Sequence, residues 1–145
     1  MIREASRDDL PALLDLWLVS TTAAHPFIDA SYWQESLGLV REVYLPGAQT
    51  WVDEEDGLRG FISVMDARFV GALFVAPDAL GQGIGGALMR HVMARVDDLS
   101  LEVYQKNTRA VNFYHHLGFR IEESAWQEET HHPTWIMHWQ ADQTP

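Results

Sequence analysis

The 145-residue sequence contains no cysteine. This absence excludes disulfide bonds, a thiolate nucleophile and zinc sites built on thiolates. No apolar run approaches the roughly 20 residues that a membrane-spanning helix needs. Residues 1–9 are charged throughout and lack the apolar segment of a signal peptide. We therefore expect a cytoplasmic protein that has no contact with a membrane.

Positive charge is also scarce. Lysine and arginine together number 10 against 21 acidic residues, Lys106 is the only lysine, and the formal net charge is −11. A nucleic-acid surface needs a basic patch, so we expect no nucleic-acid partner. The negative charge favours a cationic or amine-bearing partner, although it could equally serve only to keep the protein soluble.

The composition is that of a globular protein. Hydrophobic residues make up 47% of the chain and aromatic residues 11%, which is enough for a core. The length predicts one domain over residues 1–145 and leaves monomer and homodimer both open. Neither a repeat nor a change of composition marks a linker.

Apolar periodicity and turn residues predict alternating strands and helices. A strand at 2–5 precedes a helix that Ser6 and Asp9 would cap, and Ser31 would open a second helix with Trp33 and Tyr44 on its apolar face. The remaining expected elements are strands at 50–54, 58–65, 69–75 and 100–105, helices from 87 and over 107–118, and a closing hairpin of 120–127 and 134–140. The unbroken apolar run 69–75 predicts a strand covered on both faces.

A glycine loop follows that strand. Glycines at 81, 83, 85 and 86 allow backbone N–H groups to approach an anion closely, and the helix expected from Ala87 directs its positive end at the same place. A pyrophosphate would fit there. No lysine followed by serine or threonine closes the loop, which argues against the P-loop of nucleotide triphosphatases. The strand lies mid-chain with no clean series of βαβ units after it, which argues against a dinucleotide site. The alternative is a tight turn that binds no ligand.

Two motifs together resemble the GNAT superfamily of acetyl-CoA-dependent N-acetyltransferases. The first family pattern, V-x-P-x-x-(R/Q)-x-x-G-x-G, is matched at Val75, Pro77, Gly83 and Gly85. The second, N-x-x-A-x-x-F-Y-x-x-x-G-F, is matched at Asn107, Ala110, Phe113, Tyr114, Gly118 and Phe119. The resemblance covers essentially the whole chain. Leu80 stands where the family has Arg or Gln, and because its side chain cannot donate to a phosphate, we expect weaker affinity for the coenzyme.

The resemblance implies an α+β GNAT fold, in which a central mixed β-sheet of about seven strands is flanked by four helices. The fourth and fifth strands, 69–75 and 100–105, would splay apart, and the pantetheine arm of acetyl-CoA would pair with the backbone in the gap. The residues that would contact acetyl-CoA are Leu73, Phe74, Val75, Gly81, Gln82, Gly83, Ile84, Gly85, Gly86, Asn107, Ala110, Phe113 and Tyr114.

Acetyl transfer to an amine needs a proton donor for the departing thiolate and a route for removing the proton of the amine. By resemblance, Tyr114 is the candidate acid; the alternative is a core aromatic at helical spacing. Glu102 is the candidate base, because related enzymes place a carboxylate at this point of the fifth strand. Glu102 could instead be an exposed strand residue, with water relaying the proton.

On the acceptor side, the resemblance points to His25, Phe27 and Phe69. Phe69 would form a wall of the acceptor channel or only pack, and His25 would contact the amine or only cap a helix. A protein lysine is the expected acceptor, with a small amine as one alternative and a non-catalytic acyl-CoA-sensing module as another. The pairs His115–His116 and His131–His132 suggest metal ligands, but no set has suitable spacing, so no metal is expected.

Overall fold

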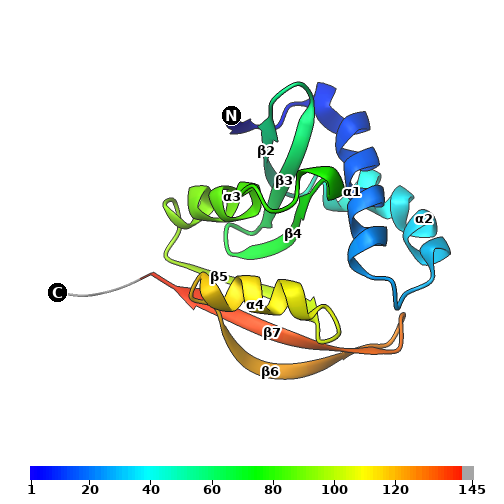
Figure 1. Cartoon of the computed structure of the whole chain (residues 1–145), viewed down its shortest axis with the longest axis vertical. Helices are drawn as coiled ribbons and strands as arrows, with labels where there is room; N and C mark the ends of the chain where they lie inside the picture. The colour runs from blue at the N-terminus through cyan, green and yellow to red at the C-terminus, as the bar shows by residue number, and fades with distance from the viewer. Residues whose placement is uncertain (142–145) are drawn as a thin grey trace.

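The computed structural model describes residues 1–141, which form one seven-stranded sheet in the order β1-β2-β3-β4-β5-β7-β6 (Figure 1). The strands are β1 Ile2–Glu4, β2 Gln49–Glu54, β3 Leu58–Met65, β4 Phe69–Val75, β5 Asp98–Tyr104, β6 Arg120–Gln127 and β7 His132–Gln140. Neighbouring strands are antiparallel except β4 and β5, which are parallel. The predicted mixed sheet is confirmed.

Four α-helices cover the sheet, as the sequence predicted: α1 Leu10–Ala24, α2 Ala30–Leu39, α3 Ile84–Met93 and α4 Thr108–His116. Three shorter helical segments accompany them, the 3₁₀ turns Arg7–Asp9 and Pro77–Ala79 and the π-helical Val40–Tyr44. Within residues 1–141, every helix falls short of the length and apolar character that crossing a membrane requires.

Two apolar clusters hold the helices to the sheet. One joins α3 and α4 to the sheet through fully buried side chains such as Leu88, Leu99 and Phe119. The other joins α1 and α2 to the sheet through Trp17, Trp33 and Phe61 among others. Figure 1 shows α3 beside β1–β4 and α4 beside β5–β7, so each part of the sheet carries its own helix.

The two parts of the sheet meet at a single point. The only residue pair between β4 and β5 is Phe69 with Ser100, and the Ser100 N–H donates to the Arg68 carbonyl at 2.8 Å. Beyond this pair the strands diverge, which confirms the predicted splay. The edge of β4 towards Val75 therefore faces a gap where another strand would otherwise lie, and its backbone groups on that edge have no strand partner.

Some local expectations need correction. Strand β4 packs against both apolar clusters, as expected of a strand covered on both faces, but it is less deeply buried than its apolar run predicts, with Val70 as its one fully buried side chain. Helix α3 begins at Ile84 rather than Ala87, since Gly83 adopts the left-handed conformation (φ +79°) that starts the helix. Gly85 and Gly86 therefore lie in the first turn of the helix, not in the loop before it.

Helix α2 also differs from the expectation. Its N-cap is Asp29, whose carboxylate accepts from the Ser31 N–H at 2.9 Å, so Ser31 lies inside the first turn. Trp33 is buried as expected, but Tyr44 is 48% exposed. The change from α- to π-helical winding at Val40 alters the spacing of side chains and turns Tyr44 towards solvent.

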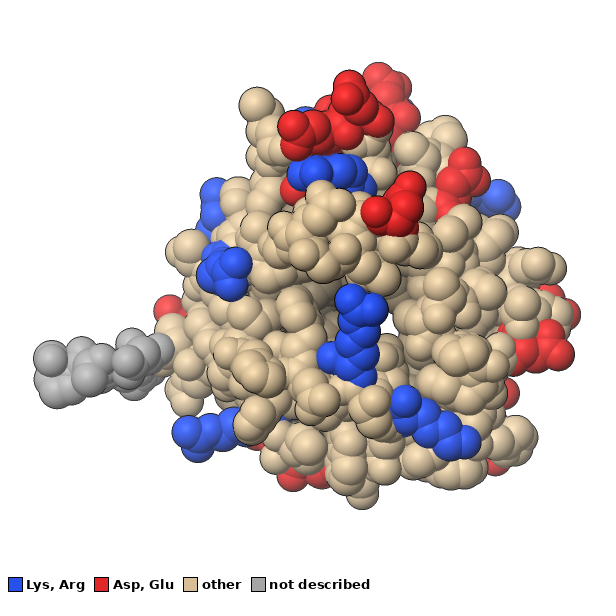
Figure 2. Space-filling model, viewed as in Figure 1, with Lys and Arg blue, Asp and Glu red and all other residues tan. Residues whose placement is uncertain are grey.

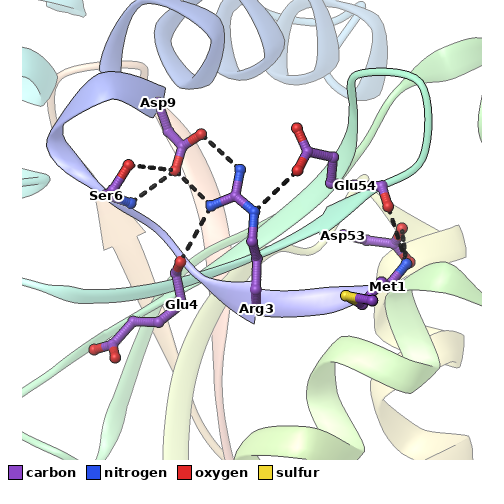
Figure 3. A network of polar contacts seen from close by, with 7 residues as sticks. All are labelled: Met1, Arg3, Glu4, Ser6, Asp9, Asp53 and Glu54. Atoms are coloured by element: carbon purple, nitrogen blue, oxygen red, sulfur yellow. Dashed lines mark hydrogen bonds and ion pairs between the residues drawn. The ribbon is translucent and has the colours of Figure 1, made fainter.

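A polar network ties β1 to the start of the first helical segment and to β2 (Figure 3). The Arg3 guanidinium donates to both carboxylate oxygens of Asp9 at 2.8 Å and to Glu54 at 3.0 Å. Asp9 also accepts from the Ser6 N–H at 2.7 Å, which is the reciprocal contact of the predicted capping box. The network fixes how the chain passes from the sheet edge into α1.

Candidate active site

The glycine loop between β4 and α3 forms an open cradle of backbone donors. Gly81 and Gly83 have φ of +83° and +79°, and a Cβ at either position would meet no atom within 4 Å. The first N–H bonded within the helix is that of Ala87, which donates to the Gly83 carbonyl at 3.0 Å. The N–H groups of the preceding turn, residues 84–86, therefore remain available, as is usual at a helix start. This donor set fits a phosphate or pyrophosphate.

The loop, β4 and α4 converge at Gly85. A Cβ there would lie 3.3 Å from Phe113 Cζ of α4 and 3.6 Å from Val75 Cγ2 of β4. At Gly86, a Cβ would lie 3.1 Å from a terminal nitrogen of Arg90, so this guanidinium folds back along α3 towards the helix start. The structure thus brings together glycine-loop, β4 and α4 residues that the sequence singled out for acetyl-CoA.

Side-chain charge complements the cradle. Figure 2 shows Lys and Arg side chains in the middle of the face that Figure 1 views, around the gap between α3 and α4, whereas acidic side chains gather where β2 turns into β3. Leu80 and Gln82 are both exposed in the loop, Leu80 at 46%. The cradle thus offers backbone donors with the Arg90 guanidinium close by, in a chain whose net charge is −11.

A bulge in β4 sets which face each of its side chains occupies. The pairing with β3 shifts register between Ser63 and Val64, so Gly71 is an extra residue in β4. Val70, Leu73 and Val75 then belong to the cluster under α3 and α4, while Ala72 and Phe74 belong to the one under α1 and α2. This bulge was not expected from the sequence, although a glycine inside a strand is its usual signal.

Helix α4 carries three of the predicted coenzyme contacts besides Phe113. Asn107 caps it as expected, and its side-chain oxygen accepts from the Ala110 N–H at 3.3 Å. Tyr114 packs at the edges of Phe113 and Phe119, with ring centroids 5.4 and 5.7 Å apart. Within the described residues the Tyr114 hydroxyl has no hydrogen-bond partner, so its proton is free to be donated. Burial raises the pKa of Tyr114 to about 12, which keeps this proton in place at neutral pH.

Glu102 lies on the opposite side of the sheet from Tyr114. On β5 the buried residues Leu99, Leu101 and Val103 face α3 and α4, so Glu102 and Tyr104 alternate onto the face of α1 and α2. The Glu102 carboxylate accepts from the Thr134 hydroxyl at 2.6 Å. Glu102 is thus a half-buried, hydrogen-bonded carboxylate rather than a fully exposed one.

Four rings on this second face form what we name the aromatic wall: His25, Phe27, Tyr104 and His132. The Phe27 centroid lies 5.7 Å from that of His25, 5.7 Å from that of Tyr104 and 5.1 Å from that of His132. His132 Nε2 also lies 3.2 Å from the Phe27 carbonyl oxygen. Neither Tyr104 nor the contact of His132 with Phe27 could be expected from the sequence, because Phe27 is distant from both along the chain.

His25 is held in one orientation inside this wall. Its Nδ1 lies 2.7 Å from the Thr21 carbonyl, which requires a proton on that nitrogen and leaves the lone pair on Nε2. Burial lowers the pKa of His25, so the ring is neutral near pH 7. Trp33 stacks beside it at 5.2 Å, and the Trp33 indole N–H is the one buried side-chain donor without a partner in the part of the chain that the structure describes.

Phe69 lies apart from the wall, at the point where β4 and β5 meet. It is half-buried and alternates onto the face opposite Val70, which is the face of the aromatic wall. The structure therefore places His25, Phe27 and Phe69 on the side of α1 and α2, and the glycine loop and Tyr114 on the side of α3 and α4. The diverging strands β4 and β5 lie between the two sides.

No group of three or more His, Asp or Glu side chains within residues 1–141 is arranged to hold a metal ion. The histidine pairs illustrate why. His116 Nδ1 lies 2.7 Å from the Asn112 carbonyl in its own helix, and His132 contacts Phe27 while His131 is exposed in a left-handed turn with φ of 55°.

The structure combines a parallel pair of strands that splay apart with a glycine loop at a helix start. Residues 46–121 match the acetyltransferase (GNAT) domain. The chain belongs to this family and is an acetyltransferase.

Individual relatives sharpen the comparison. The chain is 59% identical over 145 residues, covering 99% of both chains, to the peptidyl-lysine N-acetyltransferase YiaC of Escherichia coli (strain K12). It is 34% identical over 122 residues to the peptidyl-lysine N-acetyltransferase YjaB of the same organism, covering 83% of this chain and 82% of that protein. The solution structure of apo-form YjaB from Escherichia coli superposes with a TM-score of 0.81 at 30% identity, covering 96% of both chains.

Proposed function

We propose that this protein is an acetyl-CoA-dependent N-acetyltransferase that modifies lysine side chains of proteins. The observation that carries the proposal is the single β4–β5 residue pair, which leaves a gap bordered by phosphate donors on one side and by the aromatic wall on the other. The 59% identity to a peptidyl-lysine N-acetyltransferase supports the choice of acceptor.

On the coenzyme side, backbone N–H groups of residues 81–86 would hold the pyrophosphate, with the Arg90 guanidinium close by. The free edge of β4 at Leu73, Phe74 and Val75 would pair with the pantetheine amides, and Phe113 and Ala110 would pack along them. When bound, acetyl-CoA supplies an activated acetyl thioester. Leu80 contributes no donor, so binding depends on the backbone cradle more than in relatives that carry Arg or Gln there.

Proton transfers are assigned to Tyr114 and Glu102. The Tyr114 hydroxyl is protonated at neutral pH and unpartnered within residues 1–141, so it can give its proton to a thiolate. Glu102 lies on the acceptor face, where it can take a proton from an incoming ammonium directly or through water. The Thr134 hydroxyl that donates to Glu102 fixes the orientation of the carboxylate.

The acceptor is recognised by the aromatic wall together with nearby carboxylates. Aromatic faces attract a lysine ammonium by about 0.5–1 kcal/mol at exposed sites. Glu129, which accepts from the Tyr32 hydroxyl at 2.8 Å, adds negative charge near the outer end of the wall, where Thr130 lies 3.2 Å from the Tyr104 hydroxyl. His25 and Phe69 would complete the channel walls.

The test is thiol release from acetyl-CoA across three panels: lysine peptides, peptides with a free α-amine, and small amines. We expect turnover with lysine peptides, and a fall of about two- to fivefold in kcat/KM for Phe27→Leu without a change in coenzyme affinity, since leucine keeps bulk but loses the ring face. Val19→Ala, at an exposed site on α1, is the matched control.

Turnover with small amines alone would show that the acceptor is a small amine and not a protein lysine. Tight acetyl-CoA binding with no acetylated acceptor in any panel would instead indicate a sensing module.

A further inference from the structure

The only lysine of the chain lies on the aromatic wall. The Lys106 ammonium sits over the Phe27 ring, 5.8 Å from its centroid, within the range of a cation–π contact. Phe27 in turn contacts Tyr104 and His132. Lys106 thus occupies a place where the proposed function would put the ammonium of an acceptor.

The backbone explains why Lys106 is there. Lys106 lies two residues after Tyr104, the last residue of β5, and directly before Asn107, the N-cap of α4. The Asn107 N–H donates to the Tyr104 carbonyl at 3.0 Å, and the Gln105 N–H donates to the Pro133 carbonyl at 3.0 Å. These bonds fix a tight turn between the strand beside the gap and the helix that carries Tyr114, while the Lys106 side chain itself is exposed.

We propose that Lys106 is acetylated by its own chain, as an intramolecular acceptor. This inference rests on the proposed function, because it uses the same acetyl donor and the same acceptor face. The Lys106 ammonium first loses one proton to water, and the neutral Nζ then attacks the carbonyl carbon of the acetyl thioester. The N–C bond forms as the C–S bond breaks, the amine loses one proton to water or Glu102, and the leaving thiolate takes one proton from Tyr114. The products are N-acetyl-Lys106 and free coenzyme A.

Since Lys106 is the only lysine, acetylation of a lysine side chain can occur at this one site, and intact mass measures it directly. Purified protein is incubated with acetyl-CoA alone, and its intact mass is followed with time. We expect the mass of one acetyl group to be added. A tryptic digest should then give an uncut peptide spanning residues 96–109, because an acetylated lysine is not cleaved. Lys106→Arg keeps the charge and should lose this modification entirely.

Two controls separate self-acetylation from its alternatives. Tyr114→Phe leaves Lys106 in place, and the rate of its modification should fall at least about 10²-fold, in parallel with turnover of lysine peptides. An unchanged rate of Lys106 modification in a variant whose peptide turnover has fallen would mean chemical acetylation and would overturn the proposal. The fraction modified at a given time should not vary when the protein is diluted. A rate that falls on dilution would mean transfer between molecules and would overturn the intramolecular assignment.

The outcome is distinguishable from that of the proposed function. Wild-type protein that acetylates lysine peptides but gains no mass itself would overturn the Lys106 proposal and leave the proposed function intact. Protein that gains one acetyl group in the Lys106→Arg variant would be modified at the α-amino group instead, which also contradicts the proposal. That amine lies at the far end of the sheet, where it donates to the Glu54 carbonyl at 3.0 Å.

Discussion

At the level of single residues, the proton on Tyr114 is the first feature to test. Tyr114→Phe should lower kcat by about 10²-fold with little change in acetyl-CoA affinity, because the ring contacts with Phe113 and Phe119 remain. Because burial raises the pKa of Tyr114 to about 12, the phenol stays protonated at neutral pH, and its ionisation should not lower wild-type activity there. Tyr44→Phe, at an exposed tyrosine, is the control. Wild-type turnover in Tyr114→Phe would mean that the thiolate leaves unprotonated.

Glu102 gives a second residue-level prediction. If its carboxylate is the base, Glu102→Gln should lower the rate near pH 7 and remove the acidic limb of the pH–rate profile, since the amide cannot accept the proton. Steady-state rates across pH check this, with the exposed Glu35→Gln as control. A profile that keeps its shape would assign deprotonation to water.

Leu80 gives a third prediction at the level of single residues. Leu80→Arg should tighten acetyl-CoA binding severalfold, because a charged hydrogen bond to a phosphate contributes about 1.5–3 kcal/mol before the cost of ordering the side chain. The gain should shrink with added salt. Calorimetry checks it, with Leu39→Arg at a similarly exposed site as control. Unchanged affinity for Leu80→Arg would indicate that the backbone already satisfies the pyrophosphate.

Sequence reasoning at this scale succeeded where a signal was local. The cap at Asn107 and the glycines of the loop follow from conformational preferences within a few residues. Tyr104 was missed because its role depends on Phe27, which reaches it only through the fold. The roles of Tyr114 and Glu102 stay predictions.

At the level of elements, the order of strands and helices was predictable because apolar periodicity is imposed by burial on one face. The start of α3 and the bulge of β4 were not. Both depend on how glycine backbone is accommodated by neighbours: Gly83 starts the helix in a left-handed conformation, and Gly71 is left unpaired by the register of β3. The same glycines in other contexts would form a simple turn or a continuous strand.

The Arg3–Asp9 contact between β1 and the start of α1 gives a prediction about stability. Hydrogen bonds from Arg3 and from the Ser6 N–H hold the pKa of Asp9 well below its usual 3.8. The stabilisation is therefore complete above pH 3.8 and is lost as the pH falls towards the folded-state pKa. Asp9→Asn should lower the melting temperature at pH 7, and its difference from wild type should shrink below about pH 4.

Thermal denaturation across pH measures this difference. Asp15→Asn, at an exposed site on the helix that Asp9 precedes, is the matched control. A difference that is constant with pH would show that Asn disturbs packing rather than removing an ion pair. Burial also lowers the pKa of His25 below 6.5, so both wild type and Asp9→Asn should lose some stability below that pH as the ring is protonated.

At the level of the whole molecule, a ligand that binds only the folded chain stabilises it by mass action. Acetyl-CoA should therefore raise the melting temperature, whereas NAD and ATP should not, because the loop has no P-loop lysine and the sheet is mostly antiparallel rather than a series of parallel βαβ units. Differential scanning fluorimetry checks this. An equal shift with NAD would contradict the assignment of the glycine loop.

The single residue pair between β4 and β5 also has a consequence for amide hydrogen exchange. Amides of β4 that bond to β3 are closed inside a ladder and should exchange only when that ladder opens. Those on the opposite edge, beyond Phe69, have no strand to protect them and should exchange within the shortest labelling times. One strand in the middle of a seven-stranded sheet should therefore show alternating slow and fast amides, a pattern normally confined to strands at the rim of a sheet.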